Sequence, residues 1–523
     1  MEENIRAGLT GIFISLVVTG PFLTGKYIFL LDSVFGPRLP LFKYWSFSRL
    51  TLDFFLFFVS KTIPYIYPKA LLFLSVFLSF FFAWIFLKEK VDRASAYVFS
   101  FFYAVNPFVY NRLIAGQIFL IFSYAFLPLF LKLLMEKSSL KRDFLTGFVI
   151  SLGALQFHIL PVMLFLLFLF KLKKYFLARE SRELRSMMLI SLIVFALNVG
   201  IVYQLAEGGD ITWRISEITS SNLYSFRPSV SVANSITSLA TLHGFWRQDA
   251  YLQVWDFFPF WFILFLLIFY LVVHGYLQKP PHRNLFLLLG LTGLVLGGGA
   301  SIPLFGSFFN LIFEKVPFFA GYRDSQKFLV LLVLSYFYLG SFGLKDILHS
   351  VKNKKIHRVI SLTFILVPFL YGFPMLFGFQ GQLSPTDYPQ DWYTAEEIVG
   401  EDRCLFLPWH RYMDFKWVPN RDKRIENPAK AFFGENAITS RNPDMPGLKN
   451  PEDFVSTTVR NSLESKNIEK LRELGVKYII LAKESDYKNY LWLVNKTSLV
   501  INGTTLYLFK PLNRTANPPT KDK

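Results

Sequence analysis

Apolar runs separated by short polar loops fill the chain between residues 7 and 377. Nine of these runs approach the length of about 20 residues that a helix needs to cross the hydrocarbon core of a bilayer. They are 7–24, 70–87, 94–113, 115–135, 187–205, 254–274, 285–302, 327–345 and 358–377. The first follows "MEENIR", which is too acidic for the n-region of a signal peptide, so we expect this run to be kept as a span.

A further run, residues 144–170, has a different pattern. Its 27 residues exceed one span and fall short of two, and His158 and Pro161 interrupt it. The loops at both of its ends are net basic, which is typical of the cytoplasmic side. We therefore expect two short helices that enter and return, meeting near residues 157–161, where protein or a water-filled cavity covers the broken backbone. Counted as two crossings, this pair brings the total to about 11 transmembrane helices.

Loop charges predict the orientation of these helices. The loops at 88–93, 275–284 and 346–357 are net basic, whereas those at 206–253 and 303–326 are not. Because cytoplasmic loops carry the excess of Lys and Arg, we expect the N-terminus in the cytoplasm and the C-terminus outside the cell membrane.

The loop at 25–69 departs from this rule. It should lie outside, yet Lys and Arg outnumber Asp and Glu in it by six to two. Either the N-terminal topology is different, or the loop binds an anionic ligand. The simplest structural explanation is an interfacial helix over residues 45–63, with lysines reaching toward lipid headgroups, and such a helix is compatible with an anionic ligand.

The composition changes at about Gly378, where a soluble domain of 378–523 is predicted to follow the transmembrane domain of 1–377. "RCLFLPWH" and "VKYIILA" are typical of buried strands, "NIEKLRELG" of a helix closed by Gly475, and "TSLVINGTTLYLF" of a hairpin turning at Asn502 and Gly503. These elements indicate an α+β domain. Three glycosylation sequons fall in it, at Asn495, Asn502 and Asn513, which agrees with an extracytoplasmic position.

Composition supports an α-helical polytopic membrane protein. The chain has 523 residues, of which 53% are hydrophobic and 61 are Phe, more apolar surface than one soluble core can bury. The net charge of +18 then reflects cytoplasmic loops and anionic lipid, and no motif indicates nucleic-acid binding. A single cysteine, Cys404, excludes an internal disulfide and a cysteine-built metal site.

Polar residues gather where this topology places the outer surface, often beside aromatic residues. They are Asp32, Arg38, Lys43, Asp53, Arg112, Gln117, His158, Glu217, His243, Arg247, Asp249, Arg323, Asp324 and Lys327. A carboxylate beside several cations at the lipid boundary suits one reaction class: Arg and Lys hold a lipid-linked phosphate while the carboxylate deprotonates an attacking hydroxyl.

Each residue also has a structural interpretation. Asp32 could cap a following helix. Arg323 and Asp324 could form a local ion pair, and His158 could be a satisfied polar residue in a helix break. Arg112 and Gln117 could only close a tight turn. These interpretations are favoured for most residues singly, whereas the group together with the basic loop favours function.

The glycines of "LGGGAS" at 296–301 follow no strand and precede no Lys, so they predict close helix packing and not a phosphate loop.

Four features together resemble the GT-C superfamily of membrane glycosyltransferases. They are the aspartate of the first external loop, "NPFVYNRLIAGQIFLIFSYAFLPLFL", "VPFFAGYRDSQKFLVLL" and "LRELGVKYIILA" in the external tail. Within that superfamily the sequence is most similar to the group of YfhO-like and mycobacterial arabinofuranosyltransferase-like proteins, which is often found in archaea.

The resemblance implies a transferase that uses a polyprenyl-phosphate sugar on the outer face, with Asp32 as the catalytic base. It implies phosphate binding by Arg112, Arg323 and Lys327. Many relatives have "GH" where this chain has Gly116 and Gln117, so no proton transfer is assigned to Gln117. The first loop lacks "DxD", which argues against a divalent metal cofactor.

We therefore expect an inverting glycosyltransferase of the cell envelope that moves a sugar to an extracytoplasmic glycan, lipid or protein acceptor, with the C-terminal domain binding the acceptor. The expected substrate-binding residues are Arg38, Lys43, Arg112, Gln117, His158, His243, Arg247, Arg323, Asp324 and Lys327. The alternative is a non-catalytic polyprenyl-lipid transporter or assembly scaffold, which would grip lipid phosphate with the same cations and would tolerate loss of Asp32.

Overall fold

The computed structural model describes residues 2–38, 65–206, 220–303, 305–316, 319–442 and 453–512. The chain divides into two compact units. The first comprises Met1–Thr24 and Leu41–Ser384, and the second comprises Gly25–Pro40 and Pro385–Lys523. The described part of the loop after the first apolar run, residues 25–38, therefore belongs to the C-terminal unit.

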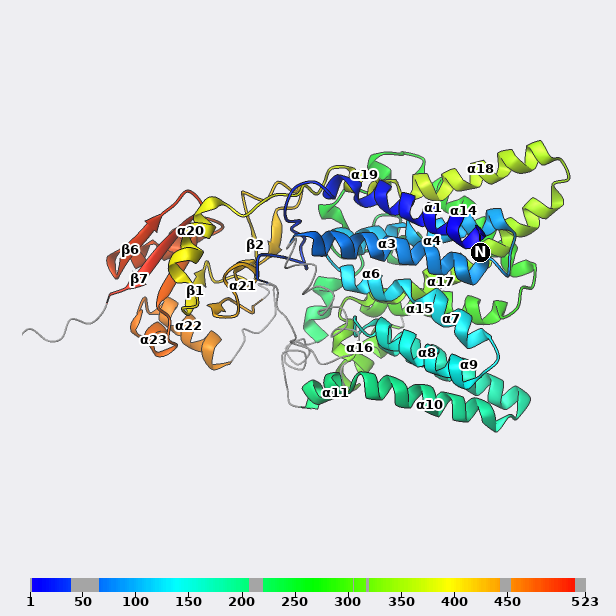
Figure 1. The fold of residues 1–523 in the computed structure, drawn as a ribbon, viewed down its shortest axis with the longest axis horizontal. Helices are drawn as coiled ribbons and strands as arrows, with labels where there is room; N and C mark the ends of the chain where they lie inside the picture. The colour runs from blue at the N-terminus through cyan, green and yellow to red at the C-terminus, as the bar shows by residue number, and fades with distance from the viewer. Residues whose placement is uncertain are drawn as a thin grey trace, which may run out of the picture. The chain divides into compact units, whose positions relative to one another are not determined.

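The first unit is helical, and Figure 1 shows its longer helices running along one another. Its α-helices are α1 (Glu2–Thr19), α3 (Ile66–Leu87), α4 (Arg93–Ala104), α5 (Pro107–Ile114), α6 (Ile118–Ala125), α7 (Leu127–Met135), α8 (Leu140–Gly153), α9 (Ile159–Ala178), α10 (Ser181–Leu197), α11 (Val199–Ala206), α13 (Ser235–Ala240), α14 (Trp261–Leu277), α15 (Arg283–Gly298), α16 (Gly306–Lys315), α17 (Leu329–Ser350), α18 (Lys354–Tyr371) and α19 (Leu376–Gln380).

Helix α17 is the buried centre of this unit, and α14 and α15 pack against it. Gly275 of α14 and Gly343 of α17 leave the two backbones in direct contact, because a Cβ on either would overlap the other helix. Gly297, in the glycine run expected to permit close packing, would place a Cβ 3.3 Å from Leu329 of α17. That packing prediction is confirmed.

Five described helical segments are long and apolar enough to cross a membrane: Glu2–Phe22, Ile66–Leu87, Ile118–Met135, Arg283–Ser301 and Ser325–Ser350. The number rises to 7 if each of two sharply bent helix pairs is one span. These segments support a membrane protein, whereas the total of about 11 crossings stays a prediction.

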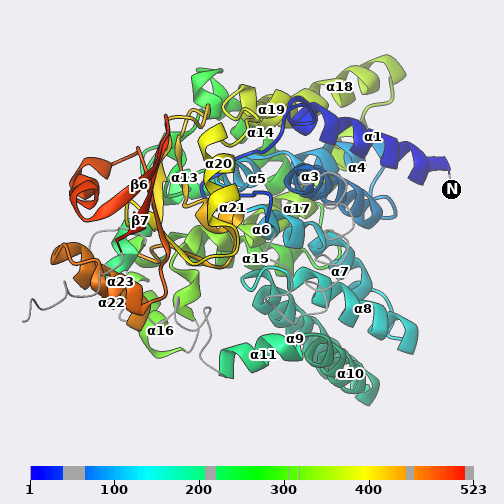
Figure 2. The ribbon, with the colours of Figure 1, turned by 60° about the vertical axis from the view of Figure 1, so that its left-hand side comes forward.

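The interrupted run 144–170 forms two helices, as predicted. Helices α8 and α9 are separated by residues 154–158, and Pro161 falls in the first turn of α9, where proline is tolerated. Helix α9 is longer than expected, since it continues to Ala178. Figure 2 shows α8, α9 and α10 side by side, and contacts join all three.

The run 94–113, predicted as one span, is not one continuous helix. It is divided into α4 and α5 at Val105 and Asn106. Pro107 disfavours helical backbone at the residue before it, and Asn106 caps α5 by accepting a hydrogen bond from Val109 N at 3.1 Å. The signal for this break, an Asn-Pro pair, was present in the sequence.

The second unit contains a mixed five-stranded sheet in the order β4-β1-β5-β7-β6. Strands β4, β1 and β5 are parallel, and β7 and β6 complete the sheet as antiparallel strands. A separate two-stranded antiparallel ribbon pairs β2 with β3. The strands are β1 (Cys404–Leu407), β2 (Tyr412–Asp414), β3 (Arg424–Glu426), β4 (Ala437–Ile438), β5 (Tyr478–Ala482), β6 (Thr497–Asn502) and β7 (Leu506–Pro511), and the helices are α20 (Gln390–Val399), α21 (Ala429–Phe433), α22 (Phe454–Glu464) and α23 (Glu469–Glu473).

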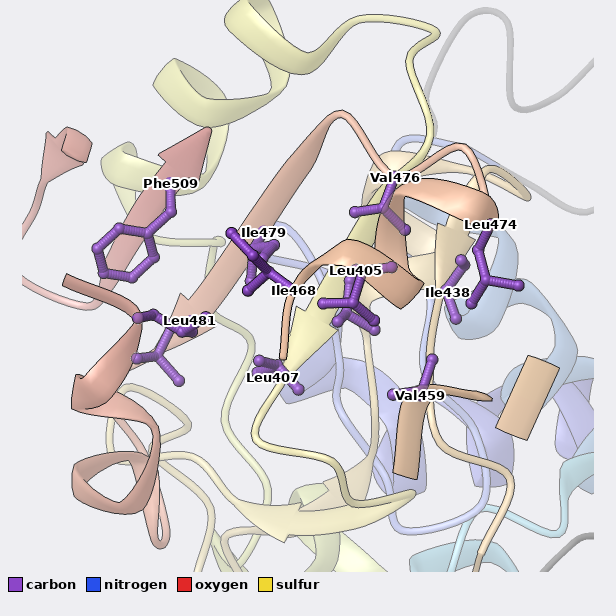
Figure 3. Packing of buried hydrophobic residues seen from close by; sticks show 12 residues of the cluster. Leu405, Leu407, Ile438, Val459, Ile468, Leu474, Val476, Ile479, Leu481 and Phe509 are labelled. Atoms are coloured by element: carbon purple, nitrogen blue, oxygen red, sulfur yellow. The ribbon is translucent and has the colours of Figure 1, made fainter. Parts of the chain in front are cut away.

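Alternation along the strands gives the sheet two apolar faces. Leu405 and Leu407 of β1 join Ile479 and Leu481 of β5 in a core that also includes Val459 of α22 (Figure 3). On the other face, Phe406 contacts Trp392 of α20, whose ring stacks on Phe433 of α21 at a centroid distance of 5.5 Å. Helices therefore cover both faces.

The elements expected in this unit are confirmed. The two predicted strands are β1 and β5, the predicted helix is α23, and the predicted hairpin is β6–β7. Its turn begins one residue later than predicted, at Gly503, because Asn502 still belongs to β6 and pairs with Tyr507. Gly475 follows α23 with a φ of +74°, the left-handed conformation expected of a closing glycine. The parallel pairing was not predicted, because three strands of two to five residues carry no signal for their order in a sheet.

Candidate functional site

The first unit contains a buried polar group that the sequence had singled out. We call it the Arg112 cluster and define it as Arg112, Gln117, His158, Asp324 and Lys327. Its members come from the end of α5, the break between α8 and α9, and the segment before α17. Folding thus brings together residues from three distant parts of the chain.

Arg112 and Asp324 form the ion pair at the centre of the cluster. Their side chains are 1% and 4% exposed. Arg112 Nη1 and Nη2 both donate to the carboxylate, the latter at 3.1 Å, and Nη1 also donates to Gln117 Oε1 at 2.9 Å. The guanidinium lies 4.7 Å from the ring centroid of Phe245. A planar bidentate pair of this kind fixes the direction of both side chains.

The turn after α5 places Gln117 beside Arg112. Gly116 adopts a φ of +84°, and its N–H bonds to the Leu113 carbonyl at 2.9 Å. The N–H of Gln117 bonds to the Arg112 carbonyl at 2.8 Å, which completes a Schellman motif. The tight-turn interpretation is therefore confirmed for the backbone, and the Arg112 side chain has the ion pair in addition.

The hydrogen bonds of His158 assign its tautomer. Its Nε2 lies 2.8 Å from the Gly321 carbonyl, which can only accept, so Nε2 carries the proton. Its Nδ1 lies 2.7 Å from the amide nitrogen of Gln156 and accepts from it. Lys327 Nζ lies 3.3 Å from Nε2, and a neutral ring is the form compatible with this ammonium group.

Further positive charge gathers around the cluster. Lys327 Nζ lies 3.8 Å from Asp324 Oδ2, and the neighbouring Arg323 places its guanidinium 5.2 Å from the ring centroid of Phe226. Arg112 and Lys327 thus both face the Asp324 carboxylate, and Arg323 precedes Asp324 in the chain. Such a group can attract a phosphate.

Two other predicted residues of this unit lie in different surroundings. His243 is 1% exposed, with the rings of Trp255 and Trp261 at centroid distances of 5.0 and 5.1 Å. Burial lowers the pKa of His243 to about 3, so its imidazole is neutral. Arg247 is half-buried and precedes η3 (Gln248–Ala250). Their predicted roles in substrate binding stay predictions.

Asp32 lies in the second unit, at the tip of a tight turn. Leu30 and Ser33 exchange backbone hydrogen bonds of 3.0 and 3.4 Å, which leaves Leu31 and Asp32 as the two central residues. The described residues that follow, 33–38, are not helical, so Asp32 does not cap a helix there. The Asp32 carboxylate, which is half-buried, accepts a hydrogen bond from the Tyr412 hydroxyl at 3.1 Å.

Arg38 also lies in the second unit and forms two ion pairs. Its Nη2 is 2.7 Å from Glu396 and its Nη1 is 2.9 Å from Glu401. The hydrogen bond to Glu396 is the main cause that raises the pKa of the Arg38 guanidinium, and Glu401 adds to it. Burial lowers this pKa but does not cancel the effect of the two carboxylates. Lys43, Asp53, Glu217 and the expected interfacial helix at 45–63 lie outside the described residues.

The residues that surround Asp32 were not predicted from the sequence. Arg411 and Tyr412 follow strand β1, and Glu426 belongs to strand β3. The available signal was the polar run "HRYMD" directly after a buried strand, since loops at the ends of parallel strands commonly carry functional side chains. Among the residues that the structure describes, no group of three or more His, Cys, Asp or Glu is arranged to hold a metal ion.

Comparison with known proteins gives a likeness in fold. No protein-family model and no curated protein matches the sequence. The fold is similar to that of the arabinofuranosyltransferase AftD from Mycobacteria, solved by cryo-electron microscopy, with a TM-score of 0.63, 12% identity and coverage of 98% of this chain. The chain spans 42% of the length of AftD. This likeness agrees with the largely helical architecture with a C-terminal sheet that was expected from the sequence.

Proposed function

We propose that this protein is a membrane glycosyltransferase of the GT-C kind, which transfers a sugar from a polyprenyl-phosphate donor to an extracytoplasmic acceptor. The observation that carries the proposal is the gathering of Lys327 and Arg323 beside the buried Arg112–Asp324 pair. The likeness in fold to a glycosyltransferase supports the same class.

In this proposal the cations receive the phosphate of the donor. Arg323 and Lys327 are partly accessible, with the Lys327 side chain 11% exposed, whereas Arg112 is buried. Lys327 lies 3.8 Å from the Asp324 carboxylate and Arg323 precedes Asp324 in the chain, so these two accessible cations are the ones proposed to meet the phosphate. Fixed cations stabilise a leaving phosphate because they need no reorganisation as its negative charge develops.

Asp32 is the proposed general base. Its carboxylate takes the proton from the acceptor hydroxyl while that oxygen forms a bond to the anomeric carbon of the sugar. The bond from this carbon to the phosphate oxygen breaks, and its electron pair leaves with the polyprenyl phosphate. Attack opposite the leaving group inverts the configuration at the anomeric carbon. In this scheme transfer takes place on the extracytoplasmic side of the membrane, where the C-terminal unit and the acceptor also lie.

The test is sugar transfer by the purified, reconstituted protein, measured with a set of labelled polyprenyl-phosphate sugars. Asp32→Asn keeps the shape of the side chain but removes the base, so turnover should be lost while donor binding is retained. Asp402→Asn is the matched control, because Asp402 lies in the same unit and pairs with Lys477 at the surface.

A non-catalytic lipid transporter or scaffold predicts a different result. The hydrogen bond from Tyr412 gives Asp32 a structural role that such a protein would also use. The scaffold would be favoured if Asp32→Asn and Asp402→Asn transfer sugar equally. It would also be favoured if the unaltered protein binds the donors but transfers none of the sugars tested.

A further inference from the structure

A cross-strand pair of the β2–β3 ribbon holds the turn that carries Asp32. Tyr412 and Glu426 are directly opposite each other in the register of the ribbon. Glu426 N donates to the Leu31 carbonyl at 2.9 Å, and the Tyr412 hydroxyl donates to Asp32 Oδ1 at 3.1 Å. Glu426 therefore holds Leu31 through the backbone, and Tyr412 holds Asp32 through its side chain.

Arg411 adds a fixed positive charge next to this pair. Its Nη2 and Nε lie 2.9 and 3.0 Å from Glu426 Oε1, and its guanidinium is 5.3 Å from the ring centroid of Tyr412. Burial alone would lower the pKa of Arg411, but its neighbours raise it overall, and the charge of Asp32 is one of the causes. Arg411 therefore lies beside the same tyrosine that donates its hydroxyl hydrogen to Asp32.

Further bonds fix the segment on both sides of the turn. The Asn420 side chain donates to the Phe29 carbonyl, and the Tyr388 hydroxyl donates to the Phe35 carbonyl at 3.0 Å. Gly36 lies so close to the Ala431 carbonyl that a Cβ there would overlap it. The whole segment is thus held by the C-terminal unit, and the position of Asp32 depends on that unit.

We infer that Tyr412 and Arg411 are positioning residues for the transfer reaction. The inference rests on the proposed role of Asp32 as base. The Tyr412 hydrogen bond restricts rotation of the carboxylate, which keeps it aimed at the acceptor hydroxyl. The Arg411 charge keeps the carboxylate ionised and ready to accept the proton. Neither residue exchanges a proton or a bond with the substrate.

Tyr412→Phe tests the hydrogen bond. Loss of a hydrogen bond to a charged group should lower kcat by about ten- to a hundredfold, with the KM for donor unchanged. Tyr393→Phe is the matched control, since the Tyr393 hydroxyl donates to another carboxylate of this unit, that of Asp387, at 2.8 Å. The kcat of Tyr393→Phe should equal that of the unaltered protein. If the kcat of Tyr412→Phe is also unchanged, the role of Tyr412 is overturned.

The pH dependence of kcat tests the charge of Arg411. Without the cation in Arg411→Met, Asp32 should take up a proton at higher pH, so the acidic limb of the profile moves upward. Arg411→Lys should restore the limb. Glu426→Gln loosens the same ion pair but removes a negative charge, so it should leave the limb in place or move it downward. An acidic limb that is unchanged in Arg411→Met would overturn the inference. So would an upward shift of the limb in both Arg411→Met and Glu426→Gln.

Asp32→Asn distinguishes failure of the positioning role from failure of the proposed function. If Asp32→Asn is inactive, while Tyr412→Phe is fully active and the acidic limb of Arg411→Met is unshifted, only the positioning role is rejected. An active Asp32→Asn rejects the proposed function itself. Thermal unfolding of each variant, followed in detergent, identifies any loss of activity that comes from unfolding, and Arg411→Lys then carries the test because it keeps the charge.

Discussion

Arg112 on α5 and Asp324, 212 residues later in the chain, form a buried ion pair that joins the start of the α17 segment to the turn after α5. Both charges are removed from solvent, so each depends on the other for its stabilisation. This relationship explains how two polar stretches that look unrelated in the sequence contribute to one site.

The first prediction concerns the stability of this pair. Asp324→Asn leaves the buried Arg112 charge without its carboxylate and should cost about 3–5 kcal/mol of unfolding free energy, whereas Arg112→Met leaves Asp324 with Lys327 at 3.8 Å and should cost less. The double variant removes both charges and should cost less than the sum of the two, as a thermal or denaturant double-mutant cycle in detergent would measure. Additive costs would show that the two side chains do not interact in solution.

The second prediction concerns Lys327 and the donor phosphate. Lys327→Met removes one of the accessible cations and should raise the KM for donor about tenfold, with a smaller effect on kcat, because a charge-assisted contact to phosphate is lost. Lys345→Met serves as the control, since Lys345 lies near the other end of α17 and donates to the Lys90 carbonyl. Equal KM values for the two variants would remove Lys327 from donor binding.

The third prediction concerns orientation. Cys404 is 1% exposed and burial raises its pKa to about 12, so the unaltered protein should resist maleimide at neutral pH until it is denatured. Because burial favours the neutral thiol, the folded state should lose stability as pH rises from about 9 to about 12.

A second cysteine then reports the orientation of the C-terminal unit. An added cysteine at the exposed Lys488 should react with an impermeant maleimide in intact cells. Labelling only after permeabilisation would place the C-terminal unit in the cytoplasm.

The fourth prediction concerns the segment at residues 25–38. Gly36→Ala introduces a Cβ that overlaps the Ala431 carbonyl, so it should loosen this segment and reduce transfer. Gly20→Ala is the control, because an added Cβ there meets no atom within 4 Å. Limited proteolysis between residues 25 and 38 should increase in Gly36→Ala alone. Equal protection of the two variants would show that the close approach is not maintained.

Local signals in the sequence predicted much of the fold. Apolar runs of sufficient length predicted the helices, the interruption at His158 predicted the α8–α9 break, and Gly475 predicted the end of α23. Such features depend on neighbours in the chain, so a single sequence contains them. The division of the run 94–113 was missed because length was given more weight than the Asn106–Pro107 pair.

Long-range features could not be predicted in the same way. Arg112 and Asp324 were both selected, but the sequence does not encode which of several charges pairs with which. The association of Asp32 with Tyr412, 380 residues away, depends on the register of the β2–β3 ribbon. No periodicity in either segment contains that information, and a single sequence provides no correlated changes between them.

The most direct test of the account is a cryo-electron-microscopy structure of the protein with polyprenyl phosphate bound. The account predicts the phosphate against Arg323 and Lys327, backed by Arg112. The phosphate should keep this position in Asp32→Asn, because Asp32 is proposed to act as the base and not in donor binding. A phosphate bound elsewhere, or one displaced in Asp32→Asn, would contradict this prediction.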